Sequence, residues 1–203
     1  MKGLGGVDML YEQFAKPEGW IGKLAGKYME RENEALNEWT IHFLTLEEGD
    51  RVLEIGFGSG GALKKALEVP GIHLFGIDPS EAMVYTALRH LHKRESTADV
   101  CLYHGEASQV TTFTQPLDKV YAVNNSTYWE KPLETLLYLR GLMRRNGKIA
   151  LTIRPHEDGA GDDTAELLGG QLQALLVKAG FQQVRIHLRD AKPNDAVCVT
   201  GMA

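Results

Sequence analysis

The stretch VLEIGFGSGGAL, residues 52–63, places one acid and four glycines where an apolar run gives way to a helix-like pattern. This order predicts a strand, a tight turn and a helix. Because glycine lacks a Cβ, such a turn lets a ligand come close to the backbone. Gly56, Gly58 and Gly61 fit the pattern G-x-G-x-x-G, and Asp78 follows at the spacing of about 20 residues typical of an acid that binds a ribose. The residues therefore predict a site for a ligand with a ribose.

Three features of the sequence distinguish a dinucleotide from a cationic ligand at this turn. Glu54 stands directly before the turn, where a carboxylate repels a pyrophosphate and attracts a cation. The turn holds no Lys or Arg and is not followed by the G-K-[ST] of a phosphate-binding loop. No Tyr of the chain has a Lys four positions later, so the Tyr/Lys pair typical of short-chain dehydrogenases is missing. A nicotinamide-dependent oxidoreductase stays open as the less favoured alternative.

Strands and helices alternate along the chain from Arg51 onward. Short Val- and Ile-rich strands between helices indicate a parallel sheet covered on both faces, so the fold class is α/β and doubly wound. The chain ends in two neighbouring strands, and a tight hairpin must add an antiparallel strand. We expect strands at 51–57, 72–78, 99–105, 118–125, 147–155, 181–190 and 195–202, and helices at 61–68, 80–94, 132–144 and 164–179.

The 203 residues suit a single domain, which we expect to combine an N-terminal helical lid or extension (1–47) with a cofactor-binding core (48–203). The helical pattern in the first part runs over residues 22–46. Tyr11, Trp20 and Met29 are large apolar groups of that segment, and its glycines would let it hinge over a ligand.

The motifs together resemble those of the class I S-adenosylmethionine-dependent methyltransferases, over about residues 48–203. The resemblance rests on LEIGFGSGG, on GIDPS, on GEA after the third strand, on AVNNSTYW after the fourth, and on the reversed terminal hairpin. It implies a Rossmann-like, mostly parallel seven-stranded sheet, the cofactor S-adenosyl-L-methionine, and S-adenosyl-L-homocysteine as product. A cofactor with a sulfonium and no phosphate agrees with acids around the turn.

The resemblance also assigns site residues. The glycines would wrap the methionine portion, Asp78 would bind both ribose hydroxyls, and Asn124 would lie beside the sulfonium. Asp78 could instead cap the following helix, with Pro79 at its first position. The cofactor-binding candidates are Glu54, Gly56, Gly58, Gly60, Asp78, Pro79, Met83, Gly105, Glu106, Ala107 and Asn124.

The acceptor of the methyl group is less clearly encoded. NNSTYW lacks the prolines of the N-P-P-[YFW] motif of methyltransferases that act on amino groups of nucleobases or glutamine side chains. We therefore expect methyl transfer to a small molecule by in-line displacement, or a non-catalytic cofactor-binding module as the alternative. His156 and Tyr128 are candidates for a catalytic base. Candidates for substrate contact are Tyr11, Trp20, Met29, Asn33, Tyr128, Trp129 and Arg154.

Composition limits the other possibilities. The net charge of −5 disfavours a nucleic-acid partner, and no apolar run reaches the roughly 20 residues that span a membrane. The histidines show no metal-binding spacing, so no metal is predicted. Cys101 and Cys198 stand in expected strands and are interpreted as buried, reduced thiols, which indicates a cytoplasmic protein. The oligomeric state stays open.

Overall fold

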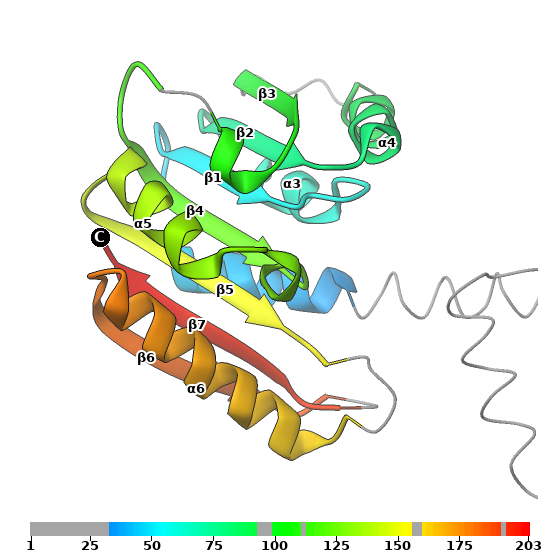
Figure 1. Cartoon of the computed structure of the whole chain (residues 1–203). Coiled ribbons are helices and arrows are strands. Elements are labelled where there is room, and N and C mark those ends of the chain that lie inside the picture. Colours follow the sequence, from blue (N-terminus) through cyan, green and yellow to red (C-terminus); the bar gives the residue numbers. More distant parts are fainter. Residues whose placement is uncertain (1–32, 93–98, 111–112, 156–159, 192–193) are drawn as a thin grey trace, which may run out of the picture. The chain divides into compact units, whose positions relative to one another are not determined.

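The computed structural model describes residues 33–92, 99–110, 113–155, 160–191 and 194–203 (Figure 1). The chain divides into two units, Met1–Leu36 and Asn37–Ala203, and the second carries every strand described here. The expected lid falls largely on residues 1–32, which lie outside the described part. Residues 33–44 are helical, in agreement with the later half of the helix expected at 22–46.

Seven strands form one sheet in the order β3-β2-β1-β4-β5-β7-β6 (Figure 1). Strands β1 to β5 run parallel, whereas β7 is antiparallel to both of its neighbours, β5 and β6. The expected mostly parallel sheet with one reversed hairpin strand is therefore confirmed. The strands are β1 Arg51–Ile55, β2 His73–Asp78, β3 Asp99–His104, β4 Leu117–Val123, β5 Met143–Ile153, β6 Gln182–Arg189 and β7 Ala196–Met202.

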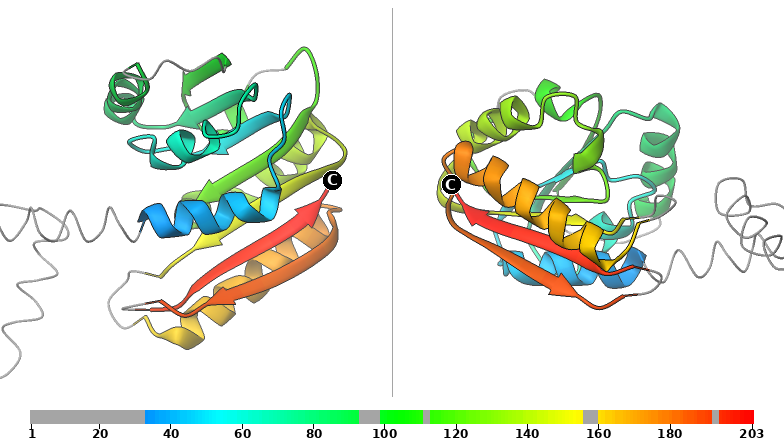
Figure 2. Two further views of the ribbon diagram at one scale, coloured as in Figure 1. Left: turned by 180° about the vertical axis from the view of Figure 1, so that it is seen from behind. Right: turned by 60° about the horizontal axis from the view of Figure 1, so that its bottom comes forward.

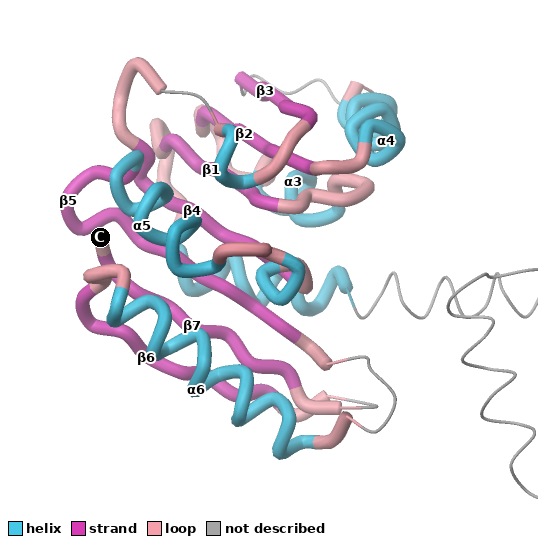
Figure 3. The backbone as a smooth tube through the Cα atoms, in the orientation of Figure 1, coloured by secondary structure: helices cyan, strands magenta, loops and turns pink. Residues whose placement is uncertain are grey.

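Helices cover both faces of this sheet, as Figures 2 and 3 show. On one face α5 and α6 bury Leu136, Leu139 and Leu176 against the strands. On the other face α3, α4 and residues 37–44 bury Leu44, Leu63 and other side chains. The helices are α3 Gly61–Ala66, α4 Glu81–Leu91, α5 Pro132–Leu142 and α6 Asp162–Lys178, with single 3₁₀ turns η1 Ala107–Gln109 and η2 Ser126–Tyr128.

The glycine turn lies where the strand order reverses. From β1 the chain moves outward to β2 and β3, and then returns to place β4 on the other side of β1. In open sheets of this kind, ligands bind beyond the carboxyl ends of the strands at such a reversal. The carboxyl ends of β1, β2 and β4 therefore position the candidate site.

Two local expectations are wrong. Strand β5 begins at Met143 rather than at residue 147, because it pairs with Leu117 before the register with β4 shifts between Leu117 and Lys119. Cys101 is exposed, whereas Cys198 is buried as expected. Cys101 lies on the edge strand β3, where a strand with a single neighbour leaves more of its surface uncovered.

Candidate functional site

The turn after β1 has a backbone that favours glycine at three positions. Gly56, Gly58 and Gly60 have φ values of 67°, 51° and 87°, in the left-handed region that other residues rarely adopt. The Gly56 N–H donates to the carbonyl of Ile77 at 2.7 Å, and the Gly60 N–H donates to that of Phe57 at 2.9 Å. The turn is thus fastened to the end of β2 and closes tightly into α3.

The space beside each glycine differs. A Cβ on Gly56 would lie 2.5 Å from the Asn125 side-chain nitrogen, and one on Gly60 would lie 3.2 Å from the Cβ of Ala87. Among the described residues, and apart from its own chain neighbours, Gly58 has no heavy atom within 4 Å of the place where a Cβ would stand. Gly56 and Gly60 are therefore required by packing within the protein, whereas Gly58 borders space that a ligand can enter.

Asp78 links the turn to the start of α4. Its carboxylate is 6% exposed and accepts hydrogen bonds at 2.8 Å from the backbone N–H groups of Gly58 and Ser80. The two carboxylate oxygens together offer about four acceptor positions, so room remains for two further donors. The same side chain can hold the turn and bind a diol.

Glu54 is buried on β1 beside this acid. It is 2% exposed and accepts a hydrogen bond at 2.8 Å from the hydroxyl of Tyr121, which lies opposite it on β4. Burial raises the pKa of Glu54 to about 8, the hydrogen bond from Tyr121 opposes this rise, and the charge of Asp78 adds to it. At neutral pH the carboxyl group therefore holds its proton for most of the time, and a cation placed nearby would favour its release.

Pro79, Met83 and their neighbours form the entrance to α4. Helix α4 begins at Glu81 and its N-cap is Ser80, whose hydroxyl accepts from the Met83 N–H at 3.4 Å. The alternative with Asp78 as the cap and Pro79 at the first helical position is wrong, because the chain is still extended at Ser80. Met83 is 39% exposed, so its thioether is accessible to a ligand.

Gly105, Glu106 and Ala107 follow β3 at the same edge of the sheet. The Gly105 N–H donates to the Asp78 carbonyl at 3.0 Å, which brings this segment beside the end of β2. The Glu106 N–H donates to the Gln109 side-chain oxygen at 2.8 Å, and the Glu106 side chain is exposed while Ala107 is buried. The segment presents one exposed carboxylate at the surface of the candidate site.

Asn124 and Asn125 follow β4, and their side chains form hydrogen bonds with different parts of the structure. Asn124 has a φ of 55°, and its side-chain oxygen accepts from the Arg154 N–H at 2.8 Å, so it faces the end of β5. The Asn125 amide donates to the Ile55 carbonyl, and its oxygen accepts from the indole N–H of Trp129 at 3.1 Å. Asn125 thereby joins the glycine turn to Trp129.

Sequence reasoning missed Asn125 and Tyr121 as members of this site. The sequence feature that could have indicated Asn125 is Gly56. Because Gly56 has no Cβ, the side-chain amide of Asn125, from the loop after β4, can lie against it. The signal for Tyr121 was its place opposite Glu54, which required knowing that β1 and β4 are neighbours.

The other candidates differ in how exposed they are. Tyr128 is 82% exposed, Trp129 is half-buried, and Arg154 is 4% exposed beyond the end of β5. Asn33 is exposed and belongs to the unit Met1–Leu36. Tyr11, Trp20, Met29 and His156 lie outside the described residues.

The described residues offer neither a metal cluster nor a membrane-spanning helix. They contain no group of three or more His, Cys, Asp or Glu side chains that could hold a metal ion. No helix in the same part of the chain is long and apolar enough to cross a membrane.

Comparisons with known proteins agree with this geometry. Residues 53–149 match the family model of a methyltransferase domain. The sheet order and the glycine turn define the class I S-adenosylmethionine-dependent methyltransferases, and the chain belongs to this family. It is 35% identical over 181 residues to the uncharacterized methyltransferase YdaC of Bacillus subtilis (strain 168), over 87% of this chain and 96% of that protein. The expected enzyme class and its cofactor, S-adenosyl-L-methionine, are thereby confirmed.

Solved structures show the same fold at lower identity. A S-adenosylmethionine-dependent methyltransferase from Aquifex aeolicus is 20% identical with a TM-score of 0.64, over 82% of this chain and 88% of that one. The magnesium protoporphyrin IX methyltransferase of Synechocystis PCC 6803, with bound cofactor, is 15% identical with a TM-score of 0.65, over 98% of this chain and 91% of that one.

Gly58→Ala tests whether the open space at the turn takes the cofactor. We expect the variant to bind S-adenosylhomocysteine about tenfold more weakly or worse, because a Cβ would project into the ligand's space and strain the turn. Gly49→Ala is the matched control. Gly49 also has a positive φ (83°), and a Cβ added to it would meet no described heavy atom within 4 Å apart from its chain neighbours, but it precedes β1. Calorimetric titration and urea unfolding of both variants check this. Normal binding by Gly58→Ala would contradict the assignment.

Glu54→Gln should change how stability depends on pH. In the folded protein Glu54 keeps a proton up to a pKa of about 8, whereas the unfolded chain releases it near 4.5. Stability of the wild type should therefore fall, relative to Glu54→Gln, as pH rises from about 4.5 to about 8, by at most about 1.4 kcal/mol per pH unit. Urea unfolding of both proteins between these limits measures the difference. A difference that is constant with pH would refute the burial of an ionisable acid here.

Proposed function

We propose that this chain transfers a methyl group from S-adenosylmethionine to a small-molecule acceptor held at the carboxyl ends of β1 and β4. The observation that carries the proposal is the pair of hydrogen bonds made by Asn125, which joins the cofactor turn to the indole of Trp129. An aromatic side chain tied to the cofactor turn is suited to place an apolar acceptor beside the methyl donor.

The cofactor side of the proposal uses the glycine turn and its acids. Gly58 would border the methionine portion, Asp78 would accept from the ribose hydroxyls, and Met83 would cover the adenine. Glu106 and Ala107 would meet the amino edge of the adenine, with Gly56, Gly60, Pro79 and Gly105 shaping the backbone around it. Asn124 would lie near the sulfonium through its backbone, because its side chain is engaged with Arg154.

Buried acids suit a cationic cofactor. Glu54 and Asp78 are both nearly inaccessible to water, so the charge of Asp78 attracts a nearby sulfonium or ammonium group more strongly than it would in bulk solvent. The same cation would favour release of the Glu54 proton, whereas a pyrophosphate would be repelled by Asp78 and would keep Glu54 protonated. This contrast supports S-adenosylmethionine over a nicotinamide dinucleotide as the ligand of the turn.

Methyl transfer requires mainly that the protein position the acceptor atom in line with the methyl carbon. When bound, S-adenosylmethionine supplies a methyl carbon whose bond to sulfur breaks as the acceptor's lone pair attacks, leaving a neutral thioether. Trp129 would exclude water and hold the acceptor in line, and the acceptor's proton would pass to solvent or to a base. Tyr128 is accessible enough to serve as a base, and His156 remains a second candidate.

The printed name of one structural neighbour supports a small-molecule acceptor. The Synechocystis neighbour is named as a methyltransferase of magnesium protoporphyrin IX, a small molecule. The net charge of −5 and the acids at the turn also favour a metabolite over a nucleic-acid acceptor.

The test is a methyl-transfer assay with labelled S-adenosylmethionine. The full chain is incubated with fractionated cell metabolites, and separately with protein and RNA fractions, and Gly58→Ala serves as the control deficient in cofactor binding. Label above that control in the metabolite fraction is the expected result. Label confined to the protein or RNA fraction would overturn the small-molecule proposal.

Asp78→Ala should weaken S-adenosylhomocysteine binding by more than about tenfold, because two charge-assisted hydrogen bonds to the ribose are lost. The control is Asp118→Ala, which removes a carboxylate that accepts from a backbone N–H, that of Arg51, at 2.8 Å, at the other end of β1. An analogue without ribose hydroxyls separates the roles of Asp78 in calorimetry. It should bind the wild type weakly and should bind Asp78→Ala no more weakly than S-adenosylhomocysteine does.

Trp129→Phe and Asn125→Ala should affect different steps, measured with the acceptor found in the assay. Trp129→Phe loses the bond to Asn125 and should raise the KM of the acceptor about tenfold, with the Kd of S-adenosylhomocysteine unchanged. Asn125→Ala also removes the hydrogen bond to the Ile55 carbonyl. It should therefore weaken the binding of both the acceptor and S-adenosylhomocysteine. Trp39→Phe is the matched control on the helix of residues 33–44. An unchanged acceptor KM in Trp129→Phe would remove Trp129 from the acceptor site.

A further inference from the structure

Strand β6 contains a bulge near its start. Gln182 pairs with Met202 and Arg185 pairs with Thr200, so the step from 182 to 185 on β6 faces the shorter step from 202 to 200 on β7. Gln183 lies in this extra length and has a left-handed φ of 51°. Bulges turn side chains away from the regular alternation of a strand, and they recur at functional sites.

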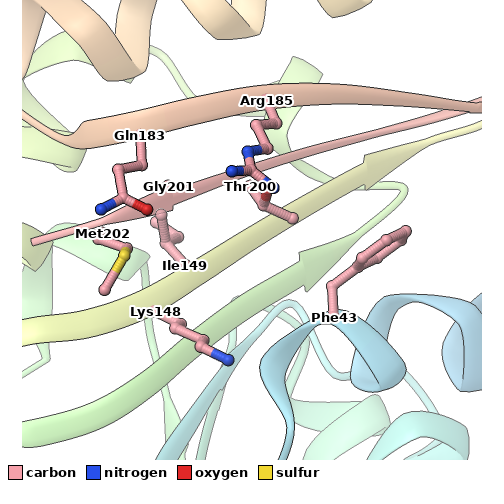
Figure 4. A pocket seen from close by; sticks show the side chains of 8 residues that line it. All are labelled: Phe43, Lys148, Ile149, Gln183, Arg185, Thr200, Gly201 and Met202. Carbon is pink, nitrogen blue, oxygen red and sulfur yellow. The ribbon is translucent and has the colours of Figure 1, made fainter.

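The bulge opens a cavity of about 160 Å³ on the sheet face opposite α5 and α6. Figure 4 shows that side chains from β5, β6 and β7 surround it, together with Phe43 from the helix of residues 33–44. In Figure 2 this helix lies over the middle of that face of the sheet. The lining residues are Phe43, Lys148, Ile149, Gln183, Arg185, Thr200, Gly201 and Met202.

Two cations and no acid belong to this lining. Lys148 comes from β5 and Arg185 from β6, on either side of β7. The Lys148 ammonium donates one hydrogen bond, to the Thr45 hydroxyl at 3.1 Å, and an ammonium has two more protons to donate. Burial and the positive charge of Arg185 lower the pKa of the neighbouring His187. The cavity is therefore locally positive in a chain whose net charge is −5.

Neutral donors and an aromatic wall complete the cavity. The Thr200 hydroxyl lies 3.1 Å from the Nε2 atom of His187, and the Gln183 side chain is exposed at the bulge. The Phe43 ring stacks on His187 with ring centres 4.1 Å apart, which holds the wall beside Thr200 in place. Cationic and hydroxyl donors around a small space are the groups that bind phosphate oxygens.

We propose that this cavity binds a phosphate group, either free or at the end of a small phosphorylated molecule. Its volume is well below the roughly 300 Å³ of common ligand pockets, so it fits a group of few atoms rather than a nucleotide. The site is separate from the cofactor site. Lys148 lies level with Lys119 and Val52 along the parallel strands, whereas the glycine turn follows Ile55.

The test is a titration of the full chain with inorganic phosphate at constant ionic strength, followed by the amide resonances of Thr200 and Gly201. We expect saturable shifts, and an affinity about tenfold lower in Arg185→Gln and in Lys148→Gln. Arg145→Gln is the matched control, because Arg145 is exposed outside this lining and should leave the affinity unchanged. Asp78→Ala should also bind phosphate normally. Glycerol 3-phosphate in place of phosphate distinguishes the two sources, since an ester ligand should bind more tightly than the free ion.

Shifts that follow ionic strength alone, or equal affinity in the wild type and a folded Arg185→Gln, would overturn the proposal. Arg185→Lys is the second variant, because it keeps the charge and should retain part of the affinity. Loss of phosphate binding in Arg145→Gln would also overturn it, by assigning the effect to overall charge or to the separate cavity that Arg145 lines with Arg140 and Arg144.

Discussion

The site depends on one steric constraint: position 56, in the turn after β1, has room for backbone only. Three of its residues adopt left-handed φ values, and the amide of Asn125 fills the place that a side chain at position 56 would take. Since Asn125 belongs to the loop after β4, this constraint links the ends of the neighbouring strands β1 and β4. The geometry of the turn and the position of the loop beyond β4 are thus set by the same contact.

Two acids, on β1 and β2, add to the interactions that hold the turn and form the candidate site. Asp78 fastens the turn through the Gly58 N–H, while Glu54 lies below it and is held by Tyr121 from β4. Each acid is buried, and each is held by a neutral donor rather than by an ion pair among these contacts. Such a site stays complementary to a cation, because Asp78 has no cationic partner among these contacts and a nearby cation would favour release of the Glu54 proton.

Residue patterns predicted most of the fold and the composition of the turn. The existence and order of the strands, the glycines and Asp78 follow from local periodicity and spacing, which depend on neighbours in sequence. The start of β5 at Met143, the exposure of Cys101 and the N-cap at Ser80 depended on pairing, edge position and local dihedrals that periodicity does not contain. Asn125 was missed for the same reason, because its partner Ile55 is far away in the sequence.

The reversed strand β7 has a consequence for how the sheet assembles. Its pairing with β6 joins residues close in sequence, since Arg189 lies opposite Ala196. Its pairing with β5 joins residues far apart in sequence, since Lys148 lies opposite Met202. Closing a long loop loses more chain entropy than closing a short one. The β6–β7 hairpin can therefore form as a local unit, and its docking against β5 is the step that requires the distant parts of the chain to meet.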